Sequence, residues 1–384
     1  MTDGRDPAWG PGPSDGTHDP GPTGETRRDG ASDSRSGSDT PASDRPGATA
    51  SNSWDAAPGV HSAWPPPPVT PPPARGLFVA AWLLAFGGVA LLTATGVVEA
   101  QGSALPGTPL RLVLSVGAFG ALAAAFAVAA AYQLRARAGR PPERYRGPSP
   151  LILLVLIVIA ISLVAGLLAA SGRLSLVAGS GGTLVAVSLT TFGYLAGIWL
   201  FVVRPHVMDW RSMGWPTTPA ALARLPVDAL TGIAVVVPAY FVVQLLAGLL
   251  AVLLGAQLPD VVPAPRSVPG AFETVLAAAI IAPFGEEAFF RGFSMTAWWR
   301  DLGLRSALIR ATLFFAAAHL VNVIGAGTGN IARTAILQFV VILPIGYVLG
   351  WLFARRGIVA SMAGHMTFNA ISVALLLSAT SFRT

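Results

Sequence analysis

The sequence predicts an all-α polytopic membrane protein in which eight or nine transmembrane helices follow a disordered N-terminal tail. Of the 384 residues, 53% are hydrophobic and only 11% are charged, with a mean hydropathy of +0.61, a composition typical of polytopic membrane proteins. From residue 76 onward, apolar stretches close to the roughly 20 residues that cross a bilayer alternate with short polar loops. Cysteine is absent, which excludes thiolate catalysis and cysteine-ligated zinc.

Residues 1–75 form the predicted tail, which is rich in Pro, Gly, Ser and Asp. The tail has very few aliphatic residues and ends in the proline runs 65–68 and 71–73. Such a segment cannot bury enough apolar surface to offset the entropy lost on ordering. We therefore expect a disordered tail, placed in the cytoplasm by the loop charges described below.

Nine apolar segments follow the tail and divide into two parts. Residues 76–225 contain the N-terminal transmembrane helices, and residues 226–384 contain a C-terminal helical core. The fourth segment is rich in Gly, Ser and Thr, and the sixth is interrupted by Pro283 and Gly285, so either could be re-entrant and eight spans is the alternative count. The segments are 76–98, 110–134, 150–171, 182–203, 229–255, 272–297, 306–324, 333–353 and 358–379.

Arginine is concentrated in alternate loops. The opposite loops hold only single arginines, so the positive-inside rule places the Arg-rich loops and the N-terminus in the cytoplasm and the C-terminus outside, in the cell membrane. Charge spread over short loops indicates orientation in a lipid bilayer and not nucleic-acid binding. The Arg-rich loops contain Arg135, Arg137, Arg140, Arg144, Arg146, Arg204, Arg211, Arg224, Arg300, Arg305, Arg355 and Arg356.

The sixth apolar segment carries three ionisable side chains, in Glu286-Glu287-Ala-Phe-Phe-Arg291. A charge at membrane depth costs at least ~2.5–3.5 kcal/mol, which makes such residues candidates for function. Glu287 and Arg291 are four residues apart on one helix face and should form a structural ion pair. Glu286 is rotated by about 100° from that pair and is free to face a cavity. Pro283 and Gly285 predict a kink and a close approach at this point.

Two later segments each carry one histidine with a partner four residues away. Phe315 precedes His319, and His365 precedes Asn369, so each pair shares a helix face. A single polar residue in a membrane helix often only hydrogen-bonds a neighbouring helix. Three such groups on three segments are harder to explain in that way, and a glutamate with two histidines is a set that can activate water.

These motifs, in this order, resemble the CAAX-protease and bacteriocin-processing (CPBP, or Abi) family of intramembrane proteases, which includes the type II CAAX prenyl endopeptidases. The resemblance covers Pro226 to about Ser378, so that residues 226–384 would be a CPBP-like protease core. It implies an endopeptidase that hydrolyses a peptide bond of a membrane-associated or prenylated, CAAX-type substrate. The motifs are Glu286-Glu287-Ala-Phe-Phe-Arg291, Phe315-Ala-Ala-Ala-His319 and His365-Met-Thr-Phe-Asn369.

The resemblance also implies roles for four residues. Glu286 and His319 would activate a water, and His365 and Asn369 would stabilise the oxyanion, with no cofactor required. An older interpretation of the family makes its Glu and His residues ligands of zinc, and Glu286, His319 and His365 would suffice for a catalytic zinc with an open position. No His-Glu-x-x-His motif is present, and a glutamate cannot readily be ligand and base at once. The metallopeptidase mechanism stands as the alternative.

Two other functions fit parts of the pattern. A non-catalytic scaffold or bacteriocin-immunity protein of the same fold would bind a peptide or partner, but a binder does not need all four polar residues. A proton- or ion-coupled transporter could use Glu286 and the histidines as a relay, but it predicts an internal repeat and the charged motif occurs once. We expect a cavity formed by the last four or five helices. It should open to the cytoplasm, because His365 lies near the Arg355–Arg356 edge.

Overall fold

The structure is a computed structural model that describes residues 74–100, 107–171, 179–259, 264–265, 267–323 and 330–381. The tail predicted over residues 1–75 lies outside these ranges, apart from its last two residues. Within the described ranges all regular elements are helical, and nine helical spans are long and apolar enough to cross a membrane. The all-α polytopic fold is confirmed, and the count for the described part of the chain is nine and not eight. The protein is therefore a multi-pass membrane protein.

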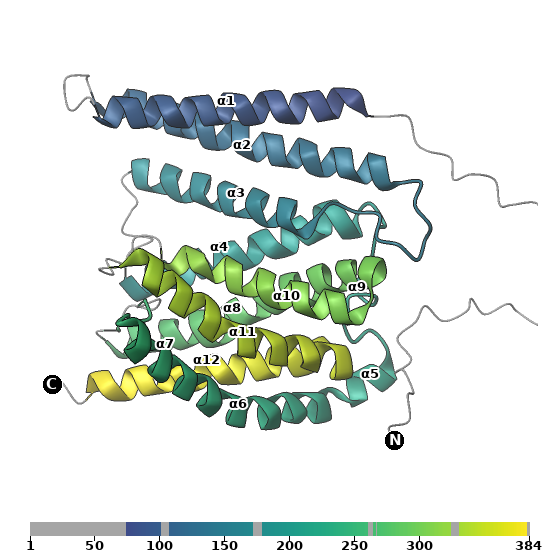
Figure 1. Cartoon of the computed structure of the whole chain (residues 1–384), viewed down its shortest axis with the longest axis vertical. Coiled ribbons are helices and arrows are strands. Elements are labelled where there is room, and N and C mark those ends of the chain that lie inside the picture. The colour runs from purple at the N-terminus through teal and green to yellow at the C-terminus, as the bar shows by residue number, and fades with distance from the viewer. Residues whose placement is uncertain are drawn as a thin grey trace, which may run out of the picture. The chain divides into compact units, whose positions relative to one another are not determined.

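The helices run back and forth across the bundle (Figure 1). The first four spans are α1 (Arg75–Ala100), α2 (Gly107–Arg137), α3 (Pro150–Ala170) and α4 (Gly179–Ile198), which the π-helical segment η2 (Trp199–Val203) extends. A short α5 (Pro219–Ala223) leads into α6 (Leu225–Leu254). The sixth span joins α7 (Val268–Val275), η3 (Leu276–Ile281), α8 (Ala282–Glu287), η4 (Ala288–Met295) and α9 (Thr296–Leu302). The last spans are α10 (Leu304–Ala318) with η5 (His319–Val323), α11 (Ile331–Arg356) and α12 (Ile358–Ser381).

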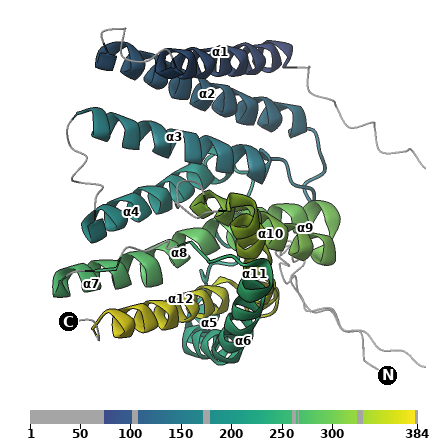
Figure 2. The ribbon, with the colours of Figure 1, turned by 60° about the vertical axis from the view of Figure 1, so that its left-hand side comes forward.

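The packing order places α11 near the centre and α1 at the edge. The α1 helix packs on α2, α2 on α3, and α3 on α4, which in turn contacts α7, η3 and α8 (Figure 2). The helices α6, α11 and α12 pack on one another, and α10 packs on α11. In the most apolar stretch of α11 half of the residues are buried, whereas in the corresponding stretch of α1 only 6% are buried. Thr334 and Gln338 of α11 are therefore enclosed by protein, whereas many apolar side chains of α1 are exposed.

Local signals explain several helix ends. Thr218 accepts a hydrogen bond from the Ala221 amide in front of Pro219, and Asn330 accepts one from the Arg333 amide at the start of α11. Both are side-chain N-caps that satisfy amides left free at a helix start. The α6 helix ends at Gly255, whose φ of 57° lies in the left-handed region, the usual glycine stop.

The contact between α6 and α12 depends on small residues. A Cβ atom added to Gly232 would collide with the main-chain carbonyl of Ala360, and one added to Gly364 would lie 2.8 Å from a methyl group of Val236. Small residues at helix contacts in membranes let the two backbones approach closely. This approach positions the N-terminal half of α12, which carries His365.

We predict that Gly232→Ala destabilises the fold, because the backbone of α12 must move to admit the new methyl group. Overpacking of this kind typically costs ~1–3 kcal/mol. Gly248 is the matched control, since it lies on the same helix and a Cβ there would meet nothing within 4 Å. The comparison is the thermal unfolding midpoint of the two variants in detergent. Equal midpoints would show that the α6–α12 contact is looser than described.

Candidate active site

The sixth span carries the charged motif and departs from regular α-helix at two places. In η3 the Ala282 amide bonds the Ala277 carbonyl, five residues back, and η4 begins directly after Glu287. In an α-helix the side chains of residues four positions apart point in directions that differ by about 40°. The wider turns of a π-helix reduce this difference. Every fourth residue therefore keeps facing one cavity, namely Ala278, Ala282, Glu286 and Phe290.

The carboxylate of Glu287 is the centre of a buried polar cluster. Arg291 donates to Oε1 of Glu287 at 2.8 Å, and both side chains are fully buried. Arg291 also donates to the Gly346 carbonyl of α11 at 3.2 Å, and its guanidinium carbon lies 4.0 Å from the centre of the Phe315 ring. An ion pair is thus present where the i,i+4 spacing predicts one, and its cation connects the sixth span to α10 and α11.

Glu287 also binds α12, a contact that the sequence does not reveal. Nδ1 of His365 lies 2.9 Å from Oε1 of Glu287, and the Ser361 hydroxyl donates to Oε2. An ionised carboxylate only accepts hydrogen bonds, so Nδ1 of His365 carries the proton in this contact. In the neutral ring Nε2 is therefore an acceptor. His365 is held in one orientation by the same carboxylate that pairs with Arg291.

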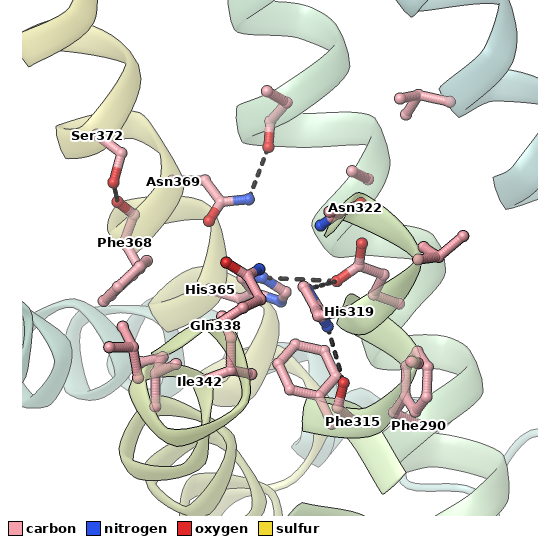
Figure 3. A pocket seen from close by; sticks show the side chains of 18 of the residues that line it. Phe290, Phe315, His319, Asn322, Gln338, Ile342, His365, Phe368, Asn369 and Ser372 are labelled. Carbon is pink, nitrogen blue, oxygen red and sulfur yellow. Dashed lines mark hydrogen bonds and ion pairs between the residues drawn. The ribbon is translucent and has the colours of Figure 1, made fainter. Parts of the chain in front are cut away.

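Glu286 approaches both histidines, and Figure 3 shows His319 and His365 in the same pocket. Oε2 of Glu286 is 3.8 Å from Nε2 of His319 and 3.7 Å from Nε2 of His365. Nδ1 of His319 bonds the Phe315 carbonyl at 2.8 Å, so in the neutral ring this Nε2 is also an acceptor. Separations beyond hydrogen-bond length leave room for a bridging water. The three side chains converge on one point although they come from three spans.

Asn369 makes a contact that follows from the proline in the sixth span. Its amide nitrogen donates to the Ala278 carbonyl at 2.8 Å. In the π register of η3 the next donor to that carbonyl would be the amide of residue 283, which is a proline and has no N–H. Asn369 supplies the missing donor and keeps one further amide proton. It therefore has a structural function in addition to the role at an oxyanion that the sequence predicts.

The α4 helix supplies a wall of the site that was not predicted. Thr191 donates to the Ile281 carbonyl at 3.0 Å, and a Cβ on Gly285 would lie 2.5 Å from the Thr191 hydroxyl. The Tyr194 ring stacks on Phe289 with centroids 4.8 Å apart. The close approach that Gly285 permits is thus made by α4. The expected cavity of the last four or five helices is corrected to one that also includes α4.

The cavity has a volume of about 520 Å³ and lies in one half of the bundle. Its lining extends from Glu286, Phe315 and His365 towards the helix ends that lie opposite the Arg-rich loops. Residues near that far end include Thr183, Leu258, Asn322 and Ser372. The expectation that the cavity opens on the Arg-rich side is therefore wrong.

The physical reason is that the other half of the bundle is filled. Between the glutamates and the Arg-rich loops, large side chains pack into a continuous core that includes Met208, Met213, Phe289, Phe293, Met295, Phe353 and Ile358. His365 is close to Arg356 along the chain, but this core separates its ring from the Arg-rich loops. Distance along one helix does not show which way a cavity extends.

The three candidate zinc ligands do not have the spacing of ligands around one metal ion. Across the described ranges of the chain, no group of three or more His, Cys, Asp or Glu is placed to hold a metal ion. Glu286, His319 and His365 have the donor types that zinc accepts. Oε2 of Glu286 is 3.8 Å from Nε2 of His319 and 3.7 Å from Nε2 of His365, whereas ligands on a tetrahedral zinc lie roughly 3.3 Å apart. The glutamate is therefore farther from both histidines than it would be in a tetrahedral zinc site.

Comparison with known families identifies the segment that carries these residues. Residues 269–371 match the family model described as type II CAAX prenyl endopeptidase Rce1-like. This segment is an Rce1-like domain. It confirms the family that the motifs indicate and contains Glu286, His319, His365 and Asn369, whereas α4 precedes it. No curated protein and no solved structure matches the chain.

Three polar residues of the Rce1-like domain were assigned no role from the sequence. Ser361 lies four residues before His365, on the same helix face, which is a usable signal. Gln338 and Asn322 line the cavity and interrupt apolar stretches, as His319 does. A polar side chain in a membrane span was the available signal for both, but an uncharged amide is weaker evidence for function than an ionisable group.

We predict that Glu287→Gln and Arg291→Met each destabilise the fold strongly and that the double variant loses less than the sum. Removing one partner leaves the other charge buried without its counter-charge, which typically costs ~3–5 kcal/mol. The exposed pair Arg140–Asp301, at 3.3 Å, is the matched control and should couple by about 1 kcal/mol or less. The measurement is a double-mutant cycle from unfolding in detergent, and additive effects at Glu287 and Arg291 would contradict the buried pair.

Cysteine labelling tests the direction of the cavity on a chain that has no cysteine of its own. We predict that a membrane-impermeant thiol reagent reaches Ser372→Cys from the same face as Leu258→Cys. Arg211→Cys, in an Arg-rich loop, should react only from the opposite face. Labelling of Ser372→Cys from the Arg211 face alone would show that the cavity opens on the Arg-rich side.

Proposed function

We propose that this protein is an intramembrane endopeptidase that cleaves a peptide bond of a membrane-associated substrate, a class that includes prenylated, CAAX-type proteins. The observation that carries the proposal is the position of the Glu286 carboxylate, 3.8 and 3.7 Å from Nε2 of His319 and His365 inside the cavity. The Rce1-like match over residues 269–371 supports protease chemistry for this segment. The Glu287 cluster supports it further, because it holds the base and one histidine in fixed positions.

In the proposed reaction Glu286 is the general base. A water between Glu286 and His319 gives one proton to the carboxylate while its oxygen attacks the carbonyl carbon of the substrate. The second O–H group of this water donates a hydrogen bond to Nε2 of His319. This bond directs a lone pair of the water oxygen towards the carbonyl carbon. The protonated Glu286 then gives its proton to the departing amine. The steps need a positioned base and a positioned water, and none passes through a metal.

The oxyanion of the tetrahedral intermediate is assigned to His365 and Asn369. His365 donates from Nε2 when its ring carries both protons, and Nδ1–H then stays on the Glu287 carboxylate, a charge-assisted hydrogen bond. Asn369 offers the amide proton that the Ala278 carbonyl does not use. Donors held in place before the reaction stabilise developing charge most effectively.

We predict that Glu286→Gln and His319→Ala abolish cleavage and leave the protein folded. A positioned general base contributes on the order of 10²–10⁴ in rate, and an oxyanion donor about 10²–10³, so His365→Ala should also be inactive and Asn369→Ala reduced. Glu273→Gln, on the same span, is the control variant and should cleave at the wild-type rate. The first measurement compares the membrane proteomes of cells that express the wild-type protein or Glu286→Gln and identifies a peptide that accumulates uncut in the variant. The second measurement follows cleavage of that peptide by each purified protein in detergent.

Purified wild-type protein freed of metal by chelation should cleave this peptide at the full rate. Activity that is lost with a stoichiometric metal and restored by zinc would overturn the metal-free mechanism. Normal cleavage by Glu286→Gln would overturn the catalytic assignment as a whole. A wild-type protein that binds peptides but cuts none would favour the non-catalytic scaffold.

A further inference from the structure

We propose that Gln338 binds the main chain of the substrate and that the cavity therefore accepts an extended peptide segment. This inference rests on the proposed endopeptidase function and adds to it the chemical form in which the substrate is held. Gln338 lies on α11, outside the four residues assigned to the reaction. Its side chain lines the cavity and is only 5% exposed.

The surroundings of Gln338 leave its carboxamide without a partner. It forms no hydrogen bond or ion pair with any residue in the described part of the chain. The other residues of α11 that line the cavity are apolar, namely Val341, Ile342 and Ile345, spaced as one helix face requires. Figure 3 shows the carboxamide in the cavity region that also holds His365 and His319. A carboxamide that faces a cavity and has no protein partner can form hydrogen bonds with a group that enters the cavity.

The chemistry of the carboxamide selects the ligand. It presents two N–H donors and one carbonyl acceptor, the complement of a peptide unit, which offers one carbonyl and one N–H. Asn322 presents a second, half-buried carboxamide from η5 to the same cavity. Acyl and prenyl chains have no groups that pair with either amide. The main chain of a peptide has them at every residue.

An apolar cavity requires such partners if it is to hold a peptide. The cavity walls include Val243, Val341, Ile345 and Phe368, none of whose side chains can form a hydrogen bond. Backbone groups withdrawn from water into such surroundings must be satisfied by the protein. A folded helix satisfies its own groups and would gain nothing from Gln338. An extended strand leaves its groups free, and it is also the form in which a general base and a water can reach a peptide carbonyl.

Binding tests the inference independently of cleavage. The probe is the peptide found to accumulate with Glu286→Gln, or a library of unstructured apolar peptides of about ten residues. It is titrated against the inactive Glu286→Gln protein and against Glu286→Gln/Gln338→Leu. We expect Gln338→Leu to weaken binding by about tenfold, the effect of one or two hydrogen bonds. Gln257→Leu is the matched control, because Gln257 is exposed and does not line the cavity.

A second measurement separates contact with the peptide from a general effect on the fold. Each peptide bond of the probe is replaced in turn by an ester, which removes one N–H. One replacement should weaken binding to Glu286→Gln about tenfold and have no effect on the Gln338→Leu double variant. Gln338→Met serves if the leucine variant does not fold. Unchanged affinity in the Gln338 variants, or equal sensitivity to every ester in both proteins, would overturn the inference. If Gln338→Leu binds normally while Glu286→Gln still abolishes cleavage, only this inference fails and the proposed function stands.

Discussion

The buried carboxylate of Glu287 is the interaction on which the site depends. A charge inside a membrane bundle is tolerated only when partners surround it, and Glu287 has Arg291 on its own span and both His365 and Ser361 on α12. These bonds fix the spacing of two spans and the rotation of the His365 ring. Because Glu286 is the next residue, the same anchor directs its carboxylate towards the cavity. One buried acid thereby positions the other.

The irregular helix geometry of the sixth span lies next to this buried carboxylate. Pro283 cannot donate to the carbonyl behind it, and the π turn around it leaves the Ala278 carbonyl to be satisfied by Asn369 from α12. The sixth span thus meets α12 through a charged cluster and an amide. Short π segments in α-helices are often found at functional sites. Here they keep Glu286 and Phe290 on the same cavity wall as Ala278.

The bundle is divided into a packed half and an open half. Aromatic and methionine side chains fill the half near the Arg-rich loops, and the cavity occupies the other half. The α4 helix, which precedes the Rce1-like domain, closes the cavity through Thr191 and Tyr194. The residues that carry the family match are therefore only part of the site, and a fragment limited to residues 269–371 would lack the walls that α4 and α6 supply.

The sequence by itself determined a bundle of eight or nine spans, the segments that carry charge and the shared face of Glu287 and Arg291. Hydropathy, the cost of a membrane charge and helical spacing are local properties, so they can be read without knowledge of neighbouring helices. Only the tertiary structure decided that His365 bonds Glu287, that Asn369 bonds Ala278 and that the cavity lies away from the Arg-rich loops. Those facts depend on how far each helix slides and turns against the others, and this is set by packing between side chains that are distant in sequence.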